Sequence, residues 1–189
     1  MHIIAGSLKG KKLATPPGPS TRPTAIRVRQ ALFDMLLHAP WGGNMVLSQA
    51  FVLDIFAGTG ALGLEALSRG AAYCYFFEND ATALPILRSN IRHCRKEAQS
   101  TIIPTSALTP PMAKQACSLA FFDPPYNREL IAQSLQALTT QGWILPNSLI
   151  VTETSRQEIL PFPKESLLAE RFHGAACLRI WRFESTWKF

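Results

Sequence analysis

The stretch that decides the fold is FVLDIFAGTGALGLEALSRG, residues 51–70. Its apolar start, residues 51–56, predicts a buried strand, and residues 61–69 predict a helix that ends at Gly70. The glycines between them allow the backbone to turn sharply and to approach a ligand closely. Strand-like and helix-like segments alternate from here onward, which predicts a mostly parallel sheet with helices on both faces.

The rest of the chain supplies the remaining elements of an α/β fold. Further strands are expected at residues 73–77, 101–103, 119–122 and 149–152, and helices at residues 24–38, 80–96 and 128–140. Residues 167–172 and 176–183 predict a closing antiparallel hairpin, and residues 2–5 with 11–14 a basic β-hairpin at the amino terminus. We therefore expect a seven-stranded, mostly parallel sheet in a domain of residues 45–189. An extension of residues 1–44, with the basic hairpin and a helix, precedes it.

Positive charge is concentrated near the amino terminus. The net charge is +6 and the sequence pI about 9.4. Six basic residues precede the first acidic residue, Asp34, and they are Lys9, Lys11, Lys12, Arg22, Arg27 and Arg29. This pattern favours a polyanionic partner, and nucleic acid ahead of a membrane because no amphipathic anchor accompanies the charge.

The composition excludes several classes of protein. Hydrophobic residues make up 47% and charged residues 17% of the chain, which indicates a folded domain and not a disordered one. No apolar run approaches the length of a membrane span. The four cysteines, Cys74, Cys94, Cys117 and Cys177, are scattered without metal-ligand spacing. We expect reduced thiols in a cytoplasmic protein, and no metal.

The glycine-rich turn is compatible with two cofactors. Residues 58–63 match the Gly-x-Gly-x-x-Gly of dinucleotide enzymes, which place a pyrophosphate on the helix amino terminus. Asp54 before the turn and Glu65 inside the helix disfavour an added anion and suit a cation. S-adenosylmethionine offers an ammonium, a sulfonium and a ribose but no phosphate. Glu78 ends the second strand, where a carboxylate can accept both hydroxyls of a ribose.

A second motif, Asp123-Pro124-Pro125-Tyr126, follows the strand expected at residues 119–122. The prolines end the strand and hold the preceding residues extended. A carboxylate and the Pro124 carbonyl can then accept both hydrogens of an exocyclic amine on a nucleobase, and Tyr126 can stack on the base. Ligands of open sheets gather where neighbouring strands end, so we expect this corner to meet the glycine turn.

Three motifs together resemble one protein family. They are Arg22-Pro23-Thr24-x-x-Arg27-Val28-Arg29-x-x-Leu32-Phe33, the run Asp54-x-Phe56-Ala57-Gly58-Thr59-Gly60-Ala61-Leu62-Gly63-Leu64-Glu65-Ala66-Leu67-Ser68-Arg69-Gly70-Ala71, and Asp123-Pro124-Pro125-Tyr126. They resemble the bacterial RsmD-type 16S ribosomal RNA guanine-N2 methyltransferases, and the resemblance covers essentially the whole chain. It implies a Rossmann-like class I fold, S-adenosylmethionine as cofactor and 16S ribosomal RNA as partner. We expect a monomer.

The resemblance also implies roles for individual residues. The cofactor would be bound by Asp54, Phe56, Ala57, Gly58, Thr59, Gly60, Glu78, Asn79, Ser106 and Ala107. Catalysis would fall to Asp123, Pro124 and Tyr126, and RNA binding to Lys9, Lys11, Lys12, Arg22 and Arg27. One departure is Ser106, where relatives often carry an acidic or amide residue that contacts the adenine amine. A hydroxyl can accept the same hydrogen bond.

Other functions remain open at this point. An NAD-dependent oxidoreductase would use the glycine turn but leaves residues 123–126 without a purpose. A DNA adenine-N6 methyltransferase or a protein glutamine methyltransferase could share the tetrapeptide, although the basic amino terminus argues against glutamine. A noncatalytic RNA-binding protein on the same scaffold would keep the basic residues and lose the cofactor.

Overall fold

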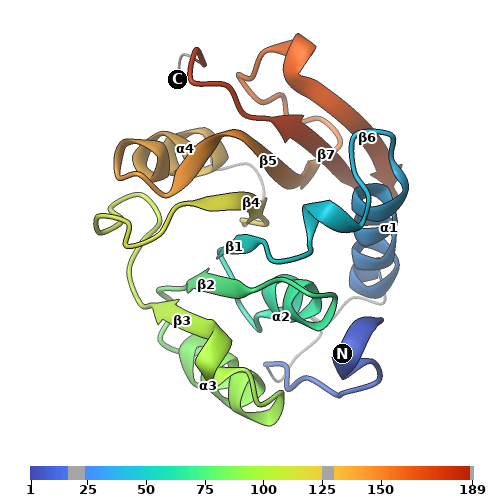
Figure 1. The fold of residues 1–189 in the computed structure, drawn as a ribbon, viewed down its shortest axis with the longest axis vertical. Coiled ribbons are helices and arrows are strands. Elements are labelled where there is room, and N and C mark those ends of the chain that lie inside the picture. Colours follow the sequence, from blue (N-terminus) through green and yellow to red (C-terminus); the bar gives the residue numbers. More distant parts are fainter. Residues whose placement is uncertain (17–23, 125–129, 188–189) are drawn as a thin grey trace.

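The computed structural model describes residues 1–16, 24–124 and 130–187. These residues form a seven-stranded sheet in the order β3-β2-β1-β4-β5-β7-β6. The strands are β1 (Phe51–Ile55), β2 (Tyr73–Phe77), β3 (Ser100–Ile103), β4 (Cys117–Phe122), β5 (Ile144–Ser155), β6 (Leu167–His173) and β7 (Ala176–Arg182). Strands β1 to β5 are parallel, and β6 and β7 form an antiparallel hairpin that joins the sheet through β5 (Figure 1). The predicted topology is confirmed.

Helices cover both faces of the sheet. The described α-helices are α1 (Thr24–His38), α2 (Ala61–Ser68), α3 (Ala83–His93) and α4 (Leu130–Thr140), and the short 3-10 helices are η1 (Gly6–Leu8), η2 (Asn44–Val46), η3 (Glu97–Gln99) and η4 (Lys164–Ser166). Side chains of a strand alternate between faces. Val52 of β1 accordingly packs in one core cluster with α1, α2 and α3, whereas Leu53 packs in a second cluster with α4.

Local signals explain where several elements begin and end. Helix α3 begins just after Asp80, whose Oδ1 accepts the N–H groups of Thr82 at 2.6 Å and Ala83 at 3.3 Å. A carboxylate in this position satisfies donors that the first helical turn leaves unpaired. Strand β5 is longer than predicted, because antiparallel pairing with β7 extends it to Ser155. No helix within the described ranges combines the length and the apolar character that crossing a bilayer requires.

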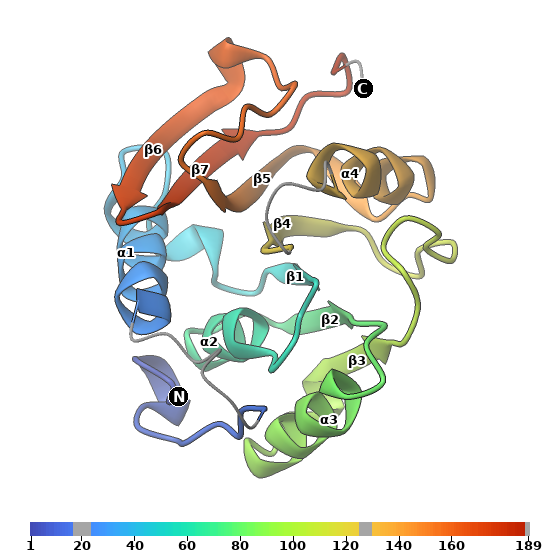
Figure 2. The ribbon, with the colours of Figure 1, turned by 180° about the vertical axis from the view of Figure 1, so that it is seen from behind.

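The amino-terminal arm, residues 1–14, differs from the predicted β-hairpin. Its two segments form one antiparallel bridge, between His2 and Lys12, which is flanked by backbone hydrogen bonds from Ile3 to Lys11 and from Leu13 to Met1, and η1 replaces the expected turn. Beside this bridge, the N–H groups of Ile4 and Ala5 donate to the carboxylate of Glu65 on α2, at 2.8 and 3.0 Å. The arm therefore packs on the helices next to the sheet, where Figures 1 and 2 both show it beside α2.

Candidate active site

A cavity of about 200 Å³ opens where β1 and β4 end. Strand β1 contributes Asp54 to its lining, the turn after β1 contributes residues 56–59, and Asp123 comes from just after the end of β4. Strands β1 and β4 are direct neighbours, with Asp54 paired to Phe121. The two sequence motifs, about 70 residues apart in the chain, therefore meet at one rim of the sheet.

The glycine turn is held in shape by two carboxylates. Asp54 Oδ2 accepts the N–H of Gly63 at 2.8 Å and ties β1 to the first turn of α2. Glu78, at the end of β2, accepts the N–H of Gly58 at 2.7 Å with Oε2 and that of Asp80 at 2.7 Å with Oε1. Each oxygen can accept a further hydrogen bond, so Glu78 can hold the turn and still bind a hydroxyl.

Glycine is required in this turn for steric reasons. Gly60 has φ +77°, and a Cβ atom there would lie 2.5 Å from Cδ1 of Leu87 on α3. Phe56 also has a positive φ, +63°, which is costly for a residue with a side chain. Such strain persists only where the surroundings enforce it, and it is concentrated at functional sites.

The cavity is acidic. Asp54, Asp123 and Glu153 line it together, and Glu153 lies on β5 one residue beyond the paired Phe122 and Thr152. Burial raises the pKa of Asp54 to about 7, the hydrogen bond from Gly63 opposes this rise, and the charge of Glu78 adds to it. The Asp123 side chain is exposed to solvent, but the protein atoms around it still reduce its hydration. This desolvation, and to a smaller extent the charges of Glu153 and Asp54, raises the pKa of Asp123 well above its usual value. A cationic ligand would relieve the repulsion.

We expect Asp54→Asn to remove a pH dependence of stability. The unfolded chain loses this proton near the usual pKa of 3.8 and the folded chain near 7, so the folded state binds the extra proton between these values. The free energy of unfolding should then fall as pH rises from about 4 to about 7, by roughly 4 kcal/mol from this group. Asparagine keeps an oxygen for Gly63 but cannot ionise.

Urea unfolding of the wild type and Asp54→Asn at about pH 4 and about pH 8 measures the difference. The variant should gain stability relative to the wild type as pH rises. Parallel stability curves across this range would contradict the pKa assigned to Asp54.

The structure groups some of the predicted site residues and separates others. Asp54, Phe56, Ala57, Gly58, Thr59 and Asp123 line the cavity. Gly60 is buried beneath the turn, Glu78 is one hydrogen bond from it, and Pro124 is buried beside Asp123. Asn79 is exposed, Ser106 accepts the N–H of Leu108 at 3.2 Å, and Ala107 packs in the core on the α4 face; none of these three lines the cavity. Tyr126 and Arg22 lie outside the described residues.

The sequence analysis gave no site role to seven of the cavity residues, and among these seven Glu153, Met1 and Arg29 carry polar or sulfur atoms. Glu153 follows the strand predicted at residues 149–152, so its place at a strand end was a usable signal. Met1 and Arg29 also line the cavity, and Thr59 Oγ1 lies 3.9 Å from the Met1 sulfur. Their position depends on how the arm and α1 pack against the sheet, and a local sequence pattern does not predict that packing.

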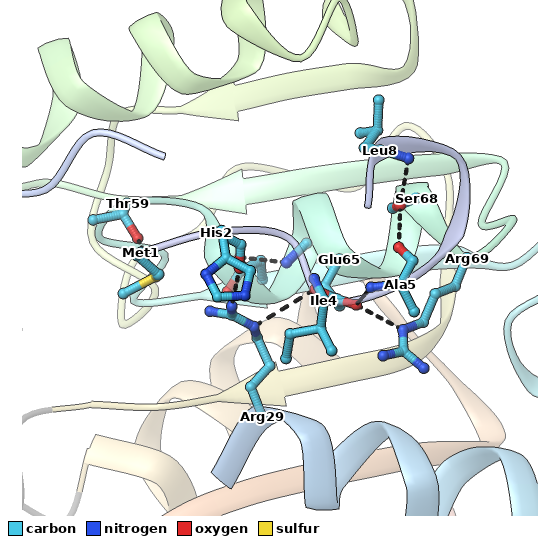
Figure 3. A network of polar contacts seen from close by, with 12 residues as sticks. Met1, His2, Ile4, Ala5, Leu8, Arg29, Thr59, Glu65, Ser68 and Arg69 are labelled. Carbon is cyan, nitrogen blue, oxygen red and sulfur yellow. Dashed lines mark hydrogen bonds and ion pairs between the residues drawn. The ribbon is translucent and has the colours of Figure 1, made fainter. Parts of the chain in front are cut away.

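Glu65, which the sequence analysis expected to disfavour an added anion, lies apart from the cavity. Its side chain is fully buried and does not line the cavity. Instead its carboxylate binds the arm and lies 3.6 Å from Nε of Arg29 and 2.8 Å from Nε of Arg69 (Figure 3). Arg29 in turn donates to the carbonyl of His2. Glu65 therefore holds the arm and Arg29 in place, and both contribute to the cavity lining.

Several known proteins are similar to this chain over nearly its whole length. A ribosomal RNA small subunit methyltransferase D from Haemophilus influenzae is 34% identical, covering 96% of this chain and 93% of the relative. The protein of the same name from Escherichia coli K12 is 35% identical, covering 98% and 91%. A solved Escherichia coli structure, yhhF, described as a proposed methyltransferase, superimposes with a TM-score of 0.81 at 32% identity over 98% of this chain and 99% of that one.

A more distant structure shows the fold alone. An RNA methyltransferase from Salinibacter ruber, solved with S-adenosyl-L-homocysteine, has a TM-score of 0.61 at 11% identity over 92% of this chain and 97% of that one. The family model described as conserved hypothetical protein 95 matches residues 1–182. The match is nearly complete and agrees with the named relatives. The chain therefore belongs to this family, the RsmD family, and has the Rossmann-like methyltransferase fold.

Proposed function

We propose that this protein transfers a methyl group from S-adenosylmethionine to the exocyclic N2 of a guanine in 16S ribosomal RNA. The observation that carries the proposal is the acidic cavity that joins the glycine turn to Asp123. The names of relatives that match nearly the whole chain support a methyltransferase that acts on small-subunit ribosomal RNA. Since that RNA is made and used in the cytoplasm, we place the protein there.

The cavity favours S-adenosylmethionine over a dinucleotide on grounds of charge. Among the described residues, three carboxyl groups line it, and the one cationic side chain that does so, Arg29, is already bound to the His2 carbonyl and lies next to Glu65. A pyrophosphate would add negative charge beside Asp54, whereas a ligand with a sulfonium and an ammonium would offset the repulsion. The enclosed 200 Å³ is smaller than the roughly 300–1,000 Å³ of typical ligand pockets. A ligand of this size would therefore extend beyond it.

Each end of the ligand has a suitable partner. Asp54 and residues 56–59 would hold the part inside the cavity, and Glu78 would accept the ribose hydroxyls. When bound, S-adenosylmethionine supplies an electrophilic methyl group on its sulfonium. Asn79, Ser106 and Ala107 remain candidates for the adenine, as the resemblance implies.

The acceptor side of the site rests on Asp123 and Pro124. The Asp123 carboxylate and the Pro124 carbonyl would accept the two N–H hydrogens of guanine N2 and orient its nitrogen. The methylated nitrogen loses a proton readily, so Asp123 acts mainly by orientation and by stabilising positive charge. Tyr126 would stack on the base after the base has left its own stack. The basic residues Lys9, Lys11, Lys12, Arg22 and Arg27 would bind the RNA backbone.

Transfer of tritium from labelled S-adenosylmethionine to small ribosomal subunits tests the function. The subunits come from an Escherichia coli strain that lacks its own methyltransferase D, and the digested RNA is separated into nucleosides. We expect label in N2-methylguanosine. Label in another nucleoside would refute the guanine-N2 assignment, and no label together with thermal protection by NAD but not by S-adenosylhomocysteine would refute the reaction class.

A further inference from the structure

Helix α3 carries a row of basic residues that the proposed site does not use. Arg88, Arg92, Arg95 and Lys96 lie along it and just after its end, and the first three are exposed. Among the described residues the ion pairs are Arg29–Glu65, Arg69–Glu65 and Arg179–Glu170, so none of these four forms an ion pair there. Glu97 is the acidic residue next to them, and it lines a hollow with Arg88 and Arg92. Four cations against one carboxylate leave the region strongly positive.

The amino-terminal arm is attached directly to this helix. The side-chain amide of Asn90, which is 1% exposed, accepts the N–H of Ala14 at 2.7 Å and donates to the Ala14 carbonyl at 3.0 Å. Lys11 Nζ donates to the carbonyl of His93 at 3.0 Å, at the end of α3. The basic residues of the arm and those of α3 therefore lie on adjoining segments, as the two opposite views also show (Figures 1 and 2).

The charges of the two segments are close enough to act on one group. Burial raises the pKa of Cys94, and the positive charges of Lys11 and Lys96 both oppose that rise. Lys11 comes from the arm and Lys96 from the end of α3, so the arm and the helix present one electrostatic surface. We call Lys9, Lys11, Lys12, Arg92, Arg95 and Lys96 the arm–α3 surface.

Arg95 occupies a position that normally favours glycine. Its φ is +55°, its N–H donates to the carbonyl of Arg92 at 2.9 Å, and the next N–H, of Lys96, donates to Ile91 at 3.1 Å. This is the left-handed ending of a helix, where glycine avoids the steric cost. An exposed arginine there is unfavourable for the backbone and places a cation where the helix ends.

Asn90 also connects this surface to the candidate active site. The same amide that holds Ala14 donates to the carbonyl of Thr59, at 2.9 Å, in the glycine turn. Met1, at the other end of the arm, lines the cavity. A polyanion bound along the arm and α3 would thus run past the cavity in which the base is held.

We propose that the arm–α3 surface binds the phosphate backbone of the ribosomal RNA beside the target nucleotide, so that the RNA-binding region extends from the arm onto Arg92, Arg95 and Lys96. This inference rests on the proposed function for the identity of the RNA. The phosphate groups of RNA match a surface of closely spaced cations, and each contact releases condensed counterions. The affinity should therefore depend steeply on salt.

The test is the salt dependence of the dissociation constant for an unmodified 16S ribosomal RNA transcript, measured without cofactor. The triple variant Arg92→Gln/Arg95→Gly/Lys96→Gln should bind roughly 10–100-fold more weakly near physiological salt. The slope of log Kd against log salt should fall by about 2–3, since each lost phosphate contact lowers it by about 0.7–0.9. Arg95→Gly alone should weaken binding while leaving Tm no lower than in the wild type, because glycine is favoured at that position.

The matched control is Lys164→Gln/Arg171→Gln, which removes exposed cations from η4 and β6 at the opposite end of the sheet. This variant should keep the wild-type slope to within the loss of one contact.

The proposal would be overturned if the triple variant and the wild type had equal slopes, or if the control lost as much affinity and slope as the triple variant. So would a triple variant that binds the transcript normally and fails only with assembled subunits, because a ribosomal protein would then be the partner. The binding readout does not require methyl transfer, so it remains informative if the proposed reaction fails.

Discussion

Asp123→Ala is expected to lower kcat for methyl transfer by at least about 100-fold while leaving the affinity for S-adenosylhomocysteine nearly unchanged. Removal of one preorganised group that stabilises developing charge costs roughly 2.7–4 kcal/mol of barrier height. Asp123 lies at the end of β4, whereas the glycine turn and Glu78 are held together by their own hydrogen bonds. The proposed cofactor contacts would therefore survive the substitution. Single-turnover assays and calorimetric titration measure the two quantities.

The conservative variant Asp123→Asn separates the charge of the carboxylate from its hydrogen bonds. It keeps one carbonyl oxygen, so we expect a smaller loss of kcat than in Asp123→Ala. Burial together with Glu153 and Asp54 raises the pKa of Asp123, so in the wild type kcat/KM should rise with pH as this group ionises. The asparagine variant should lose that rise in part, because Asp54 also titrates. Equal losses of turnover and of cofactor affinity in Asp123→Ala would contradict the assigned role.

The half of the site that depends on strand ends was predictable from the sequence. Asp54 lies near the end of one apolar run and Asp123 directly after another, and the carboxyl ends of neighbouring parallel strands meet at one edge. The structure places both carboxyl groups in one cavity for this reason. Glu153 could have been found by the same rule, because it directly follows the strand predicted at residues 149–152, although the observed β5 continues to Ser155.

The parts built by long-range packing were not predictable. Glu65 looked like a charge near the ligand because it lies one turn inside α2. Apart from Arg69, four residues further on, its partners Ile4, Ala5 and Arg29 are between 36 and 61 residues away in the chain. The same contact attaches the amino-terminal arm to α2. A local pattern reports periodicity and turn chemistry, and it carries no information on which distant donors a buried carboxylate will satisfy.

Glu65 is the most heavily used carboxylate among the described residues, so the stability of the fold depends on it. Glu65→Gln is expected to lower the free energy of unfolding by about 3–5 kcal/mol, since it leaves Arg29 and Arg69 buried without a counter-charge. Both guanidinium groups are at most 7% exposed, and Arg69 also lies over the Phe33 ring at 4.6 Å. The amide nitrogen of glutamine would in addition face N–H donors that the carboxylate now accepts. Urea unfolding measures the loss.

Glu170→Gln provides the control for that experiment. Glu170 Oε2 lies 2.6 Å from Nε of Arg179, but its side chain is 34% exposed, so loss of this ion pair should cost less than about 1 kcal/mol. Glu65→Gln should also release the arm, and trypsin should then cleave after Lys9, Lys11 and Lys12 faster than in the control. Since Met1 of the arm lines the cavity, a released arm should weaken binding of S-adenosylhomocysteine as well. Stability losses of similar size in the two variants would show that the arm is not held through Glu65.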